Sequence, residues 1–227
     1  MVQKLIILGC GGNALDLFDI VDAINRVTPT WQVDGFLDDR REQDSEYLGF
    51  RVLGRLPDAR RFEDCLFAST IWNEITFRNL HRVLASTHVD RSRFATLVHP
   101  AASVSARARL GQGVIVNFGA SIAGNVTIDD HVSIGPGCIV GHDSIIDSYT
   151  CVAAGAVISG GVHVQRNCYV GSGAMVRQRI RIGEKALVGL GAVVVKDVDA
   201  LATVAGNPAR TISQRQLLAR ETIGVSK

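Results

Sequence analysis

A six-residue repeat runs through the second half of the chain. Starting at Val98, every sixth residue up to Val194 is aliphatic, which makes 17 consecutive positions with no insertion. A second series with the same step, starting at Ala102, consists almost entirely of small residues. Neither the period of an α-helix nor that of a β-strand produces this pattern, whereas a solenoid of hexapeptides does.

The repeat predicts triangular coils in which each hexapeptide supplies one short strand and one corner. Three hexapeptides make one coil, so 17 of them predict between five and six coils. The aliphatic residue points into the centre, the small residue fits the corner, and each coil buries its neighbours. Glycines beside the aliphatic residues suit tight corners. These are Gly111, Gly135, Gly141, Gly171, Gly183 and Gly189.

The first 95 residues have a different composition and predict a small α/β domain. They hold seven of the eight Phe and both Trp. We expect strands at 4–9, 31–37, 65–69 and 94–98, and helices at 14–26 and 74–84. Alternating strands and helices favour a parallel sheet with helices on its faces. The expected domains are therefore 1–95 and 96–200, followed by a C-terminal tail at 201–227.

The composition argues against several classes of protein. The 24 Lys and Arg nearly balance 22 Asp and Glu, which gives a net charge of +2. A protein that coats nucleic acid would show a dense basic stripe, so this class is not favoured. No apolar run approaches the roughly 18 residues of a membrane helix, and the N-terminus does not resemble a signal peptide. The five cysteines are scattered without a CxxC pair, which favours a reducing cytoplasm and no zinc knuckle.

The dipeptide His142-Asp143 is the candidate catalytic site. The residues one full coil before and after His142 are Gly124 and Gly160, so the imidazole is expected between two glycines and open to a substrate. A histidine can take a proton from an attacking amine or hydroxyl near neutral pH, and Asp143 can fix its tautomer. The alternative is an exposed histidine with no catalytic role.

The chain resembles a known family over its whole length. A small nucleotide-type domain, a β-helix with His142-Asp143 at mid-length and the segment 204–210 (VAGNPAR) are similar to the sialic acid O-acetyltransferase family of hexapeptide acyltransferases. That family includes bacterial N-acetyltransferases of nucleotide-linked amino sugars. The resemblance implies a small Rossmann-like α/β domain followed by a left-handed parallel β-helix. It also implies acetyl-CoA as co-substrate, His142 as general base, and a homotrimer with the CoA groove between two chains.

A glycine-rich loop at 9–13 precedes the first helix, and its backbone N–H groups favour a phosphate. The resemblance implies that this loop, the end of the second strand and the loop after the third strand hold a sugar nucleotide. The expected substrate-binding residues are Gly11, Gly12, Asn13, Asp38, Asp39 and Asn73. Asn13 takes the place of a histidine that is frequent in the family. For Asp38-Asp39, the alternative is a solvated turn.

Stacked glycines in the later coils predict a flat floor for acetyl-CoA. Gly155, Gly173 and Gly191 each lie one full coil apart and are near basic residues of the C-terminal coils. The alternative is a solvated basic rim. The full set of expected cofactor-binding residues is Cys151, Gly155, Gly160, Ser172, Gly173 and Gly191.

Two residue changes distinguish this chain from its relatives. Cys151 stands nine residues after His142, where related sugar acetyltransferases often have a second histidine, and 135–137 (GPG) replaces a turn that contains Asn. We expect Cys151 to be passive, because no cation lies near it in sequence to lower the pKa of the thiol. In the zinc carbonic anhydrase class of this fold, two of the histidine ligands lie five residues apart. The histidines of this β-helix, at 131, 142 and 163, contain no such pair, so we expect no metal site.

The leading hypothesis is a cytoplasmic enzyme of bacterial surface glycan biosynthesis. It would transfer acetyl directly from acetyl-CoA to the amine of a nucleotide-linked amino sugar, with His142 as general base. One alternative is O-acetylation of a sialic-acid-like sugar. Another is a non-catalytic hexapeptide scaffold or sugar-nucleotide-binding module. A sugar nucleotidyltransferase would need a far larger N-terminal domain.

Overall fold

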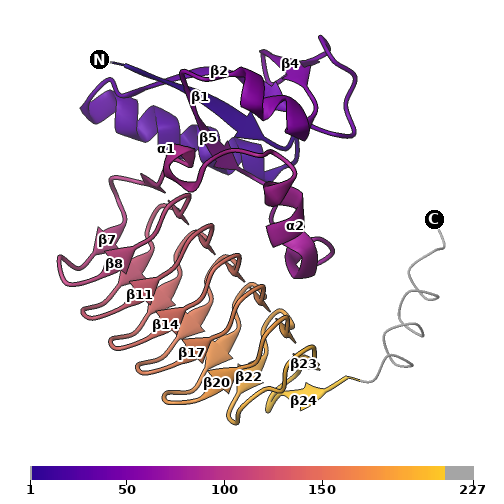
Figure 1. The fold of residues 1–227 in the computed structure, drawn as a ribbon. Coiled ribbons are helices and arrows are strands. Elements are labelled where there is room, and N and C mark those ends of the chain that lie inside the picture. The colour runs from indigo at the N-terminus through magenta and orange to yellow at the C-terminus, as the bar shows by residue number, and fades with distance from the viewer. Residues whose placement is uncertain (1, 213–227) are drawn as a thin grey trace, which may run out of the picture.

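The computed structural model describes residues 2–212, in which an N-terminal sheet domain lies above a row of stacked β-coils (Figure 1). The domain is built on a five-stranded sheet of order β3-β4-β2-β1-β5. β1 (Gln3–Leu8) pairs in parallel with β2 (Trp31–Leu37) and with β5 (Cys65–Ser69). β4 (Phe50–Gly54) lies parallel to β2, and β3 (Glu46–Tyr47) lies antiparallel at the edge. The predicted parallel sheet is confirmed for β1, β2 and β5. A strand that was not predicted, β4, adds a fourth parallel strand, and β3 makes the sheet mixed.

Helix α1 (Asn13–Val27) follows the glycine-rich loop directly and packs an apolar stripe against the sheet domain. It extends the predicted helix at 14–26 by one residue at each end. Three short 3-10 helices complete the domain and its link to the coils: η1 (Leu56–Arg61), η2 (Phe77–Asn79) and η3 (Arg91–Arg93).

Two of the predicted elements are wrong in extent. The helix expected at 74–84 is η2 followed by α2 (Leu80–Ala85), because the carboxamide of Asn73 accepts hydrogen bonds from the Ile75 and Thr76 amides and holds that segment in a turn. The strand expected at 94–98 divides between two sheets. Phe94 forms an isolated bridge with Phe67 of β5, whereas 97–98 pairs with the β-helix.

The second part is a parallel β-helix whose strands form three sheets, here called faces 1, 2 and 3. Face 1 contains β6 (Leu97–Val98), β9 (Ile115–Val116), β12 (Ser133–Ile134), β15 (Cys151–Val152), β18 (Tyr169–Val170), β21 (Leu187–Val188), β23 (Thr203–Ala205) and β24 (Arg210–Thr211). Face 2 contains β7 (Ser103–Val104), β10 (Ser121–Ile122), β13 (Ile139–Val140), β16 (Val157–Ile158), β19 (Met175–Val176) and β22 (Val193–Val194). Face 3 contains β8 (Arg109–Leu110), β11 (Thr127–Ile128), β14 (Ile145–Ile146), β17 (His163–Val164) and β20 (Arg181–Ile182).

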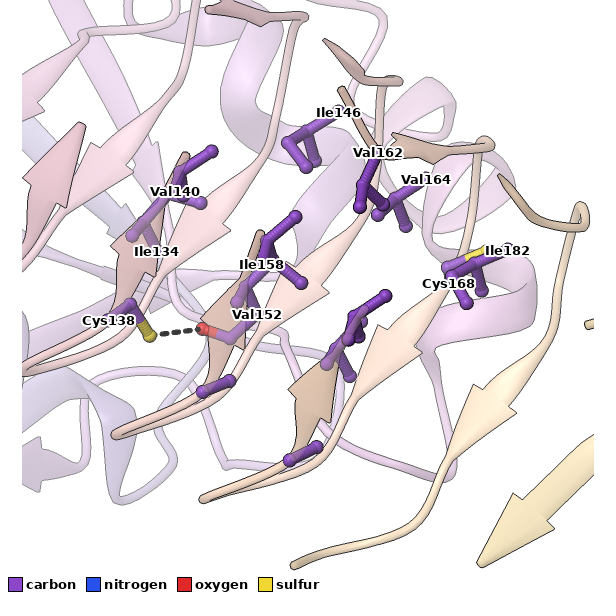
Figure 2. Close-up of a cluster of buried hydrophobic side chains, with 14 of the residues drawn as sticks. Ile134, Cys138, Val140, Ile146, Val152, Ile158, Val162, Val164, Cys168 and Ile182 are labelled. Atoms are coloured by element: carbon purple, nitrogen blue, oxygen red, sulfur yellow. Dashed lines mark hydrogen bonds between the residues drawn. The ribbon is translucent and has the colours of Figure 1, made fainter. Parts of the chain in front are cut away.

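The hexapeptide prediction is confirmed in register, because the repeated aliphatic is the second residue of every strand from β6 to β22. These side chains point into the β-helix together with the small corner residues (Figure 2). From Val116 onward they are almost fully buried, whereas Val98, Val104 and Leu110 are only partly buried, since no earlier coil covers them. Glycine is needed beside the aliphatic residues because the backbones of successive coils approach each other closely there. A Cβ on Gly141, for example, would lie 2.5 Å from the amide nitrogen of Gly160.

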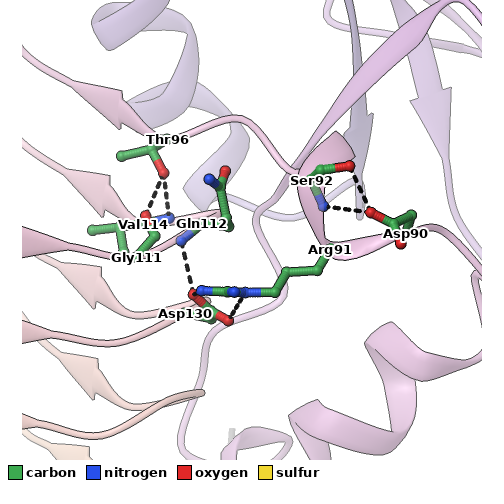
Figure 3. A network of polar contacts seen from close by, with 8 residues as sticks. All are labelled: Asp90, Arg91, Ser92, Thr96, Gly111, Gln112, Val114 and Asp130. Atoms are coloured by element: carbon green, nitrogen blue, oxygen red, sulfur yellow. Dashed lines mark hydrogen bonds and ion pairs between the residues drawn. The ribbon is translucent and has the colours of Figure 1, made fainter.

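The N-terminal domain packs on face 1 of the β-helix. Arg91 pairs with the carboxylate of Asp130, which also accepts a 2.8 Å hydrogen bond from the Gln112 amide (Figure 3). Two coils later at the same corner, between faces 3 and 1, the Asn167 carboxamide donates to the carbonyl of Phe77 at 2.8 Å. Face 1 is therefore covered within the chain, while faces 2 and 3 carry exposed apolar side chains such as Ile139 and Ile145. Among residues 2–212, no helix has the length and apolar character needed to cross a membrane.

Candidate active site

His142 lies at the corner between faces 2 and 3, in the turn that joins β13 to β14. Its side chain is 75% exposed, and its Nδ1 lies 2.7 Å from Oδ2 of Asp143. The other oxygen of Asp143 accepts a 2.5 Å hydrogen bond from the Asn125 carboxamide, one coil earlier. Hydrogen bonds from Asn125 and then His142 hold the pKa of Asp143 below its ordinary value, so this carboxylate is ionised at neutral pH.

The coil register places His142 between Gly124 and Gly160, as the period of the repeat requires. The Asp143 amide donates to the Gly124 carbonyl, and the Gly161 amide donates to the His142 carbonyl. A Cβ on Gly160 would lie 2.8 Å from Nε2 of His142 and 2.9 Å from Cε1, so the ring lies against this glycine. The imidazole therefore keeps one fixed contact and leaves the rest of its edge open to solvent.

A second candidate region is a pocket of about 210 Å³ between the N-terminal domain and face 1, here called the interdomain pocket. Cys151 and Ser172 line it from the β-helix, and Asn13, Asp16 and Trp72 line it from the N-terminal domain. Cys151 is 7% exposed and pairs in register with Ser133 and Tyr169. Burial, followed by the charges of nearby groups, raises the pKa of its thiol to about 12. The predicted passive character of Cys151 agrees with this environment.

The predicted glycine floor lies at the corner between faces 1 and 2. Gly155, Gly173 and Gly191 have φ of +68°, +66° and +63°, and a Cβ on any of them would meet no atom closer than 3.9 Å. Their column ends beside the interdomain pocket, which Ser172 also lines. Gly160, also among the predicted cofactor-binding residues, lies at the corner of His142, where its place one full coil after His142 puts it.

A third region surrounds the glycine-rich loop, where a pocket of about 600 Å³ lies near the start of α1 and is here called the loop pocket. Gly11 lines it, and Gly12 is the N-cap of α1 with no side-chain cap. The Ala14 and Leu15 amides already donate to the carbonyls of Gly11 and Gly12, and the dipole of a helix favours an anion at its N-terminal end. Arg40 and Arg41, which the sequence analysis did not select, add two cations to the lining.

Three of the predicted substrate-binding side chains already have partners within the chain. The oxygens of Asp38 accept from the Cys10, Arg40 and Arg41 amides, so this carboxylate holds the loop in place, and Asp38 also lines the loop pocket. Oδ1 of Asp39 accepts a hydrogen bond from the Leu56 amide, and Oδ1 of Asn73 accepts hydrogen bonds from the Ile75 and Thr76 amides. Both residues line the loop pocket.

Asn13 is a further departure from the expected set. Its carboxamide nitrogen donates to the carbonyls of Thr70 and Trp72, at 3.1 and 2.7 Å. This side chain therefore ties α1 to the segment after β5, and it lines the interdomain pocket rather than the loop pocket.

The predicted site residues thus fall into separate groups within one chain. His142 and Asp143 are at the corner between faces 2 and 3, whereas Cys151, Ser172 and the glycine column lie on face 1 and the corner between faces 1 and 2. Within the described part of the chain, no group of three or more metal-binding side chains is present. Asn125 was not among the predicted site residues, although its place one full coil before Asp143 was a usable signal.

Comparison with known proteins links this geometry to a class of enzyme. The family model described as bacterial transferase hexapeptide (six repeats) matches residues 125–160, which include His142 and Asp143. No curated protein matches the chain in a sequence search.

Several solved structures share the whole architecture. The acetyltransferase domain of PglB from Neisseria gonorrhoeae FA1090 is 28% identical with a TM-score of 0.79, and the match covers 92% of this chain and 100% of that one. The same domain is also known in complex with acetyl coenzyme A. PerB from Caulobacter crescentus, in complex with CoA and GDP-perosamine, is 27% identical with a TM-score of 0.79 and coverage of 94% and 99%.

WeeI from Acinetobacter baumannii AYE, at 24% identity and a TM-score of 0.79, supports the fold alone. These comparisons confirm the predicted class of enzyme, an acyltransferase. The chain has a hexapeptide transferase repeat, and the similar solved structures are acetyltransferases. The predicted co-substrate is supported in the same way, because those neighbours hold acetyl-CoA or CoA. The chain is therefore similar in fold and sequence to acetyl-CoA-dependent sugar N-acetyltransferases.

Proposed function

We propose that this protein transfers the acetyl group of acetyl-CoA to the amine of a nucleotide-linked amino sugar. The observation that carries this proposal is the exposed imidazole of His142, whose Nδ1 faces the Asp143 carboxylate at 2.7 Å. The similarity to PerB, known in complex with CoA and GDP-perosamine, supports the choice of an amine acceptor on a nucleotide sugar over O-acetylation of a sialic-acid-like sugar.

The tautomer of His142 follows from its partner. An ionised carboxylate only accepts hydrogen bonds, so a neutral imidazole beside Asp143 must donate from Nδ1. Its Nε2 then carries the lone pair and can take a proton from the attacking amine. The amine nitrogen bonds to the thioester carbonyl carbon, the carbon–sulfur bond breaks, and the proton held by His142 passes to the departing thiolate to give CoA.

Recognition of the nucleotide is assigned to the loop pocket. The uncapped start of α1 and the cations Arg40 and Arg41 suit a diphosphate. The volume of about 600 Å³ lies in the range of ordinary ligand pockets. The polar side chains of Asp39 and Asn73 line the same pocket and suit a ribose or a base. The glycine column at the corner between faces 1 and 2 gives a flat surface for acetyl-CoA.

A homotrimer would unite the separated groups. In one chain, His142 is on the opposite side of the β-helix from face 1, so the interdomain pocket lacks its base. Exposed Ile139 and Ile145 flank the corner of His142, and exposed Met175 lies on face 2 two coils later. These side chains suit contact with another copy. We propose that His142 of one copy enters the interdomain pocket of the next. Light scattering should give three chains, and a monomer at micromolar concentration would contradict this assembly.

We also propose a cytoplasmic location, where acetyl-CoA is available and the five free cysteines would stay reduced. A thermal-shift screen tests the substrate assignment. GDP-, UDP- and dTDP-linked amino sugars should be compared with free sugars, each with and without CoA. One nucleotide class should raise the melting temperature, as ligands that bind only the folded state do. Equal shifts with the free sugar would contradict a nucleotide acceptor.

A further inference from the structure

Asn125 lies directly behind the pair formed by His142 and Asp143. Its Nδ2 donates to Oδ1 of Asp143 at 2.5 Å, while Oδ2 of Asp143 faces Nδ1 of His142 at 2.7 Å. The two oxygens of one carboxylate therefore hold two different side chains, one from the preceding coil and one from its own coil. None of the similarities described above assigns a role to Asn125.

We propose that Asn125 is a positioning residue that fixes the Asp143 carboxylate and, through it, the tautomer and orientation of His142. This proposal rests on the proposed function, in which His142 is the base. Asn125 does not touch the reacting atoms, so its effect reaches the reaction only through Asp143.

Such an anchor is needed because the corner is exposed. The side chains of His142 and Asp143 are 75% and 55% exposed, and an isolated pair at this exposure exchanges readily with water. A carboxylate held at one oxygen has its other oxygen fixed in direction. Asn125 thereby removes the rotational freedom of Asp143 that would otherwise let the imidazole turn away.

The backbone brings the two short side chains together. Asn125 and Asp143 have φ of +61° and +60°, a left-handed conformation that Asn and Asp tolerate better than most residues. They occupy the same place in successive coils, and the Asp143 amide donates to the carbonyl of Gly124, the residue before Asn125. The coils thus stack Asn125 under Asp143 with little freedom in either backbone.

In the described part of the chain, the coils after Asp143 donate no side-chain hydrogen bond to its carboxylate. The position one coil after Asp143 is Gly161, which has no side chain, and the position after that is Arg179. The carboxamide of Asn125 is therefore the side-chain donor that the stack supplies to Asp143. Its amide group suits this place, because a second carboxylate would repel Asp143 and raise its pKa.

The test uses two substitutions that both keep the left-handed backbone, Asn125→Gly and Asn125→Asp, in the full chain. Nitrogen-15 NMR of the His142 ring, without substrate, should show an imidazole protonated at Nδ1 in the native protein. Both variants should show a mixture of tautomers. The pKa of Asp143, followed by carbon-13 NMR, should rise in both, and further in Asn125→Asp.

The kinetic measurement compares the change in kcat with the change in KM. We expect kcat to fall by about 3- to 30-fold in Asn125→Gly with little change in either KM, since the ground-state contacts of both substrates are unaffected. Combining Asn125→Gly with Asp143→Asn should add little to Asp143→Asn alone, because the two residues act through one contact. Leu201→Gly, an exposed residue of the same β-helix with φ of +64°, is the control for adding glycine and should leave kcat unchanged.

Native ring tautomers and native kcat in Asn125→Gly would overturn the proposal. So would a fall in melting temperature and kcat with the His142 tautomer unchanged, because that combination indicates a purely structural role. Failure of the proposed function is seen separately, as full turnover in His142→Ala. The ring spectra report the effect of Asn125 on His142 whether or not acetyl transfer occurs.

Discussion

The imidazole of His142 lies against the Cα atom of Gly160, one coil later in the β-helix. A Cβ at Gly160 would lie 2.8 Å from Nε2 and 2.9 Å from Cε1, both too short for ordinary contact. On the other side of the ring, a Cβ on Gly124 would meet only the hydroxyl of Ser105 at 3.6 Å. The ring of His142 thus requires a glycine at position 160, one coil later, but not at position 124, one coil earlier.

Gly160→Ala should therefore displace the ring and lower kcat by about 10- to 100-fold, since misplacing a reacting group by about 1 Å has effects of this size. Gly124→Ala is the matched control in the same column and should stay within about 2-fold of the native rate, a change of less than about 0.5 kcal/mol. Steady-state kinetics of both variants checks the expectation. Equal rates for the two would show that the Gly160 contact does not place the ring.

Replacing His142 by Ala should lower kcat by about 10²–10⁴-fold, the usual effect of losing a general base. Binding of both substrates should change little, because the ring acts mainly in the transition state. Asp143→Asn should cost less, since it orients the base without exchanging a proton. Kd values measured by calorimetry, together with the rates, separate a loss of substrate binding from a loss of turnover. A His142→Ala enzyme with near-native turnover would remove the proposed mechanism.

Cys151→Ala should keep at least about a tenth of the native activity, because a thiol with a pKa of about 12 supplies almost no thiolate at neutral pH. Direct attack in a ternary complex also predicts initial-rate plots that intersect. Parallel lines, together with an acetylated Cys151 found by mass spectrometry, would instead indicate a covalent intermediate.

Acid should weaken the contact between the domains through His131. This buried ring stacks on Tyr149 at 5.1 Å and meets Phe94 edge-on at 4.5 Å, and burial lowers its pKa from 6.5 to about 4. Between these values the unfolded chain binds more protons than the folded one. The contribution of His131 to stability is therefore complete above pH 6.5 and declines as the pH falls toward 4.

Urea unfolding at fixed protein concentration, at pH 7 and pH 4.5, measures this effect. The free energy of unfolding should drop by about 2 kcal/mol more in the native protein than in His131→Asn, given roughly 1.4 kcal/mol for each unit of pKa shift. The charges of Asp130 and Arg91 act on the same ring. Arg91 stays protonated throughout this pH range, and comparing the two proteins cancels the titration of Asp130. The same pH dependence in both proteins would show that His131 is not the group responsible.

The β-helix could be predicted almost residue by residue, because its period is local and repeats. From Val98 to Val194, each predicted aliphatic takes the same place in its strand. The same period placed His142 against Gly160, and it also places Asn125 one coil before Asp143.

The N-terminal domain was less accessible to prediction, because its contacts join distant residues. The carboxylate of Asp38, which was predicted to bind substrate, also accepts a hydrogen bond from the Cys10 amide 28 residues away. Asn13, predicted to bind substrate as well, also donates to the carbonyls of Thr70 and Trp72. No sequence pattern shows these contacts. Both β3 and β4 were missed. β3 has only two residues, which carry too little pattern, and its Tyr47 is held by packing on Phe36.

The most direct test of the proposed function is to identify the acetylated product. The purified protein should be incubated with acetyl-CoA and with GDP-, UDP- or dTDP-linked amino sugars, their hydroxyl analogues and free sialic acid, and the products should be examined by mass spectrometry and NMR. We expect one nucleotide-linked amino sugar to gain a single acetyl group on nitrogen, at a rate that falls at least about 100-fold in His142→Ala. Acetylation of sialic acid but of no amino sugar, or equal rates for the native protein and His142→Ala, would contradict it.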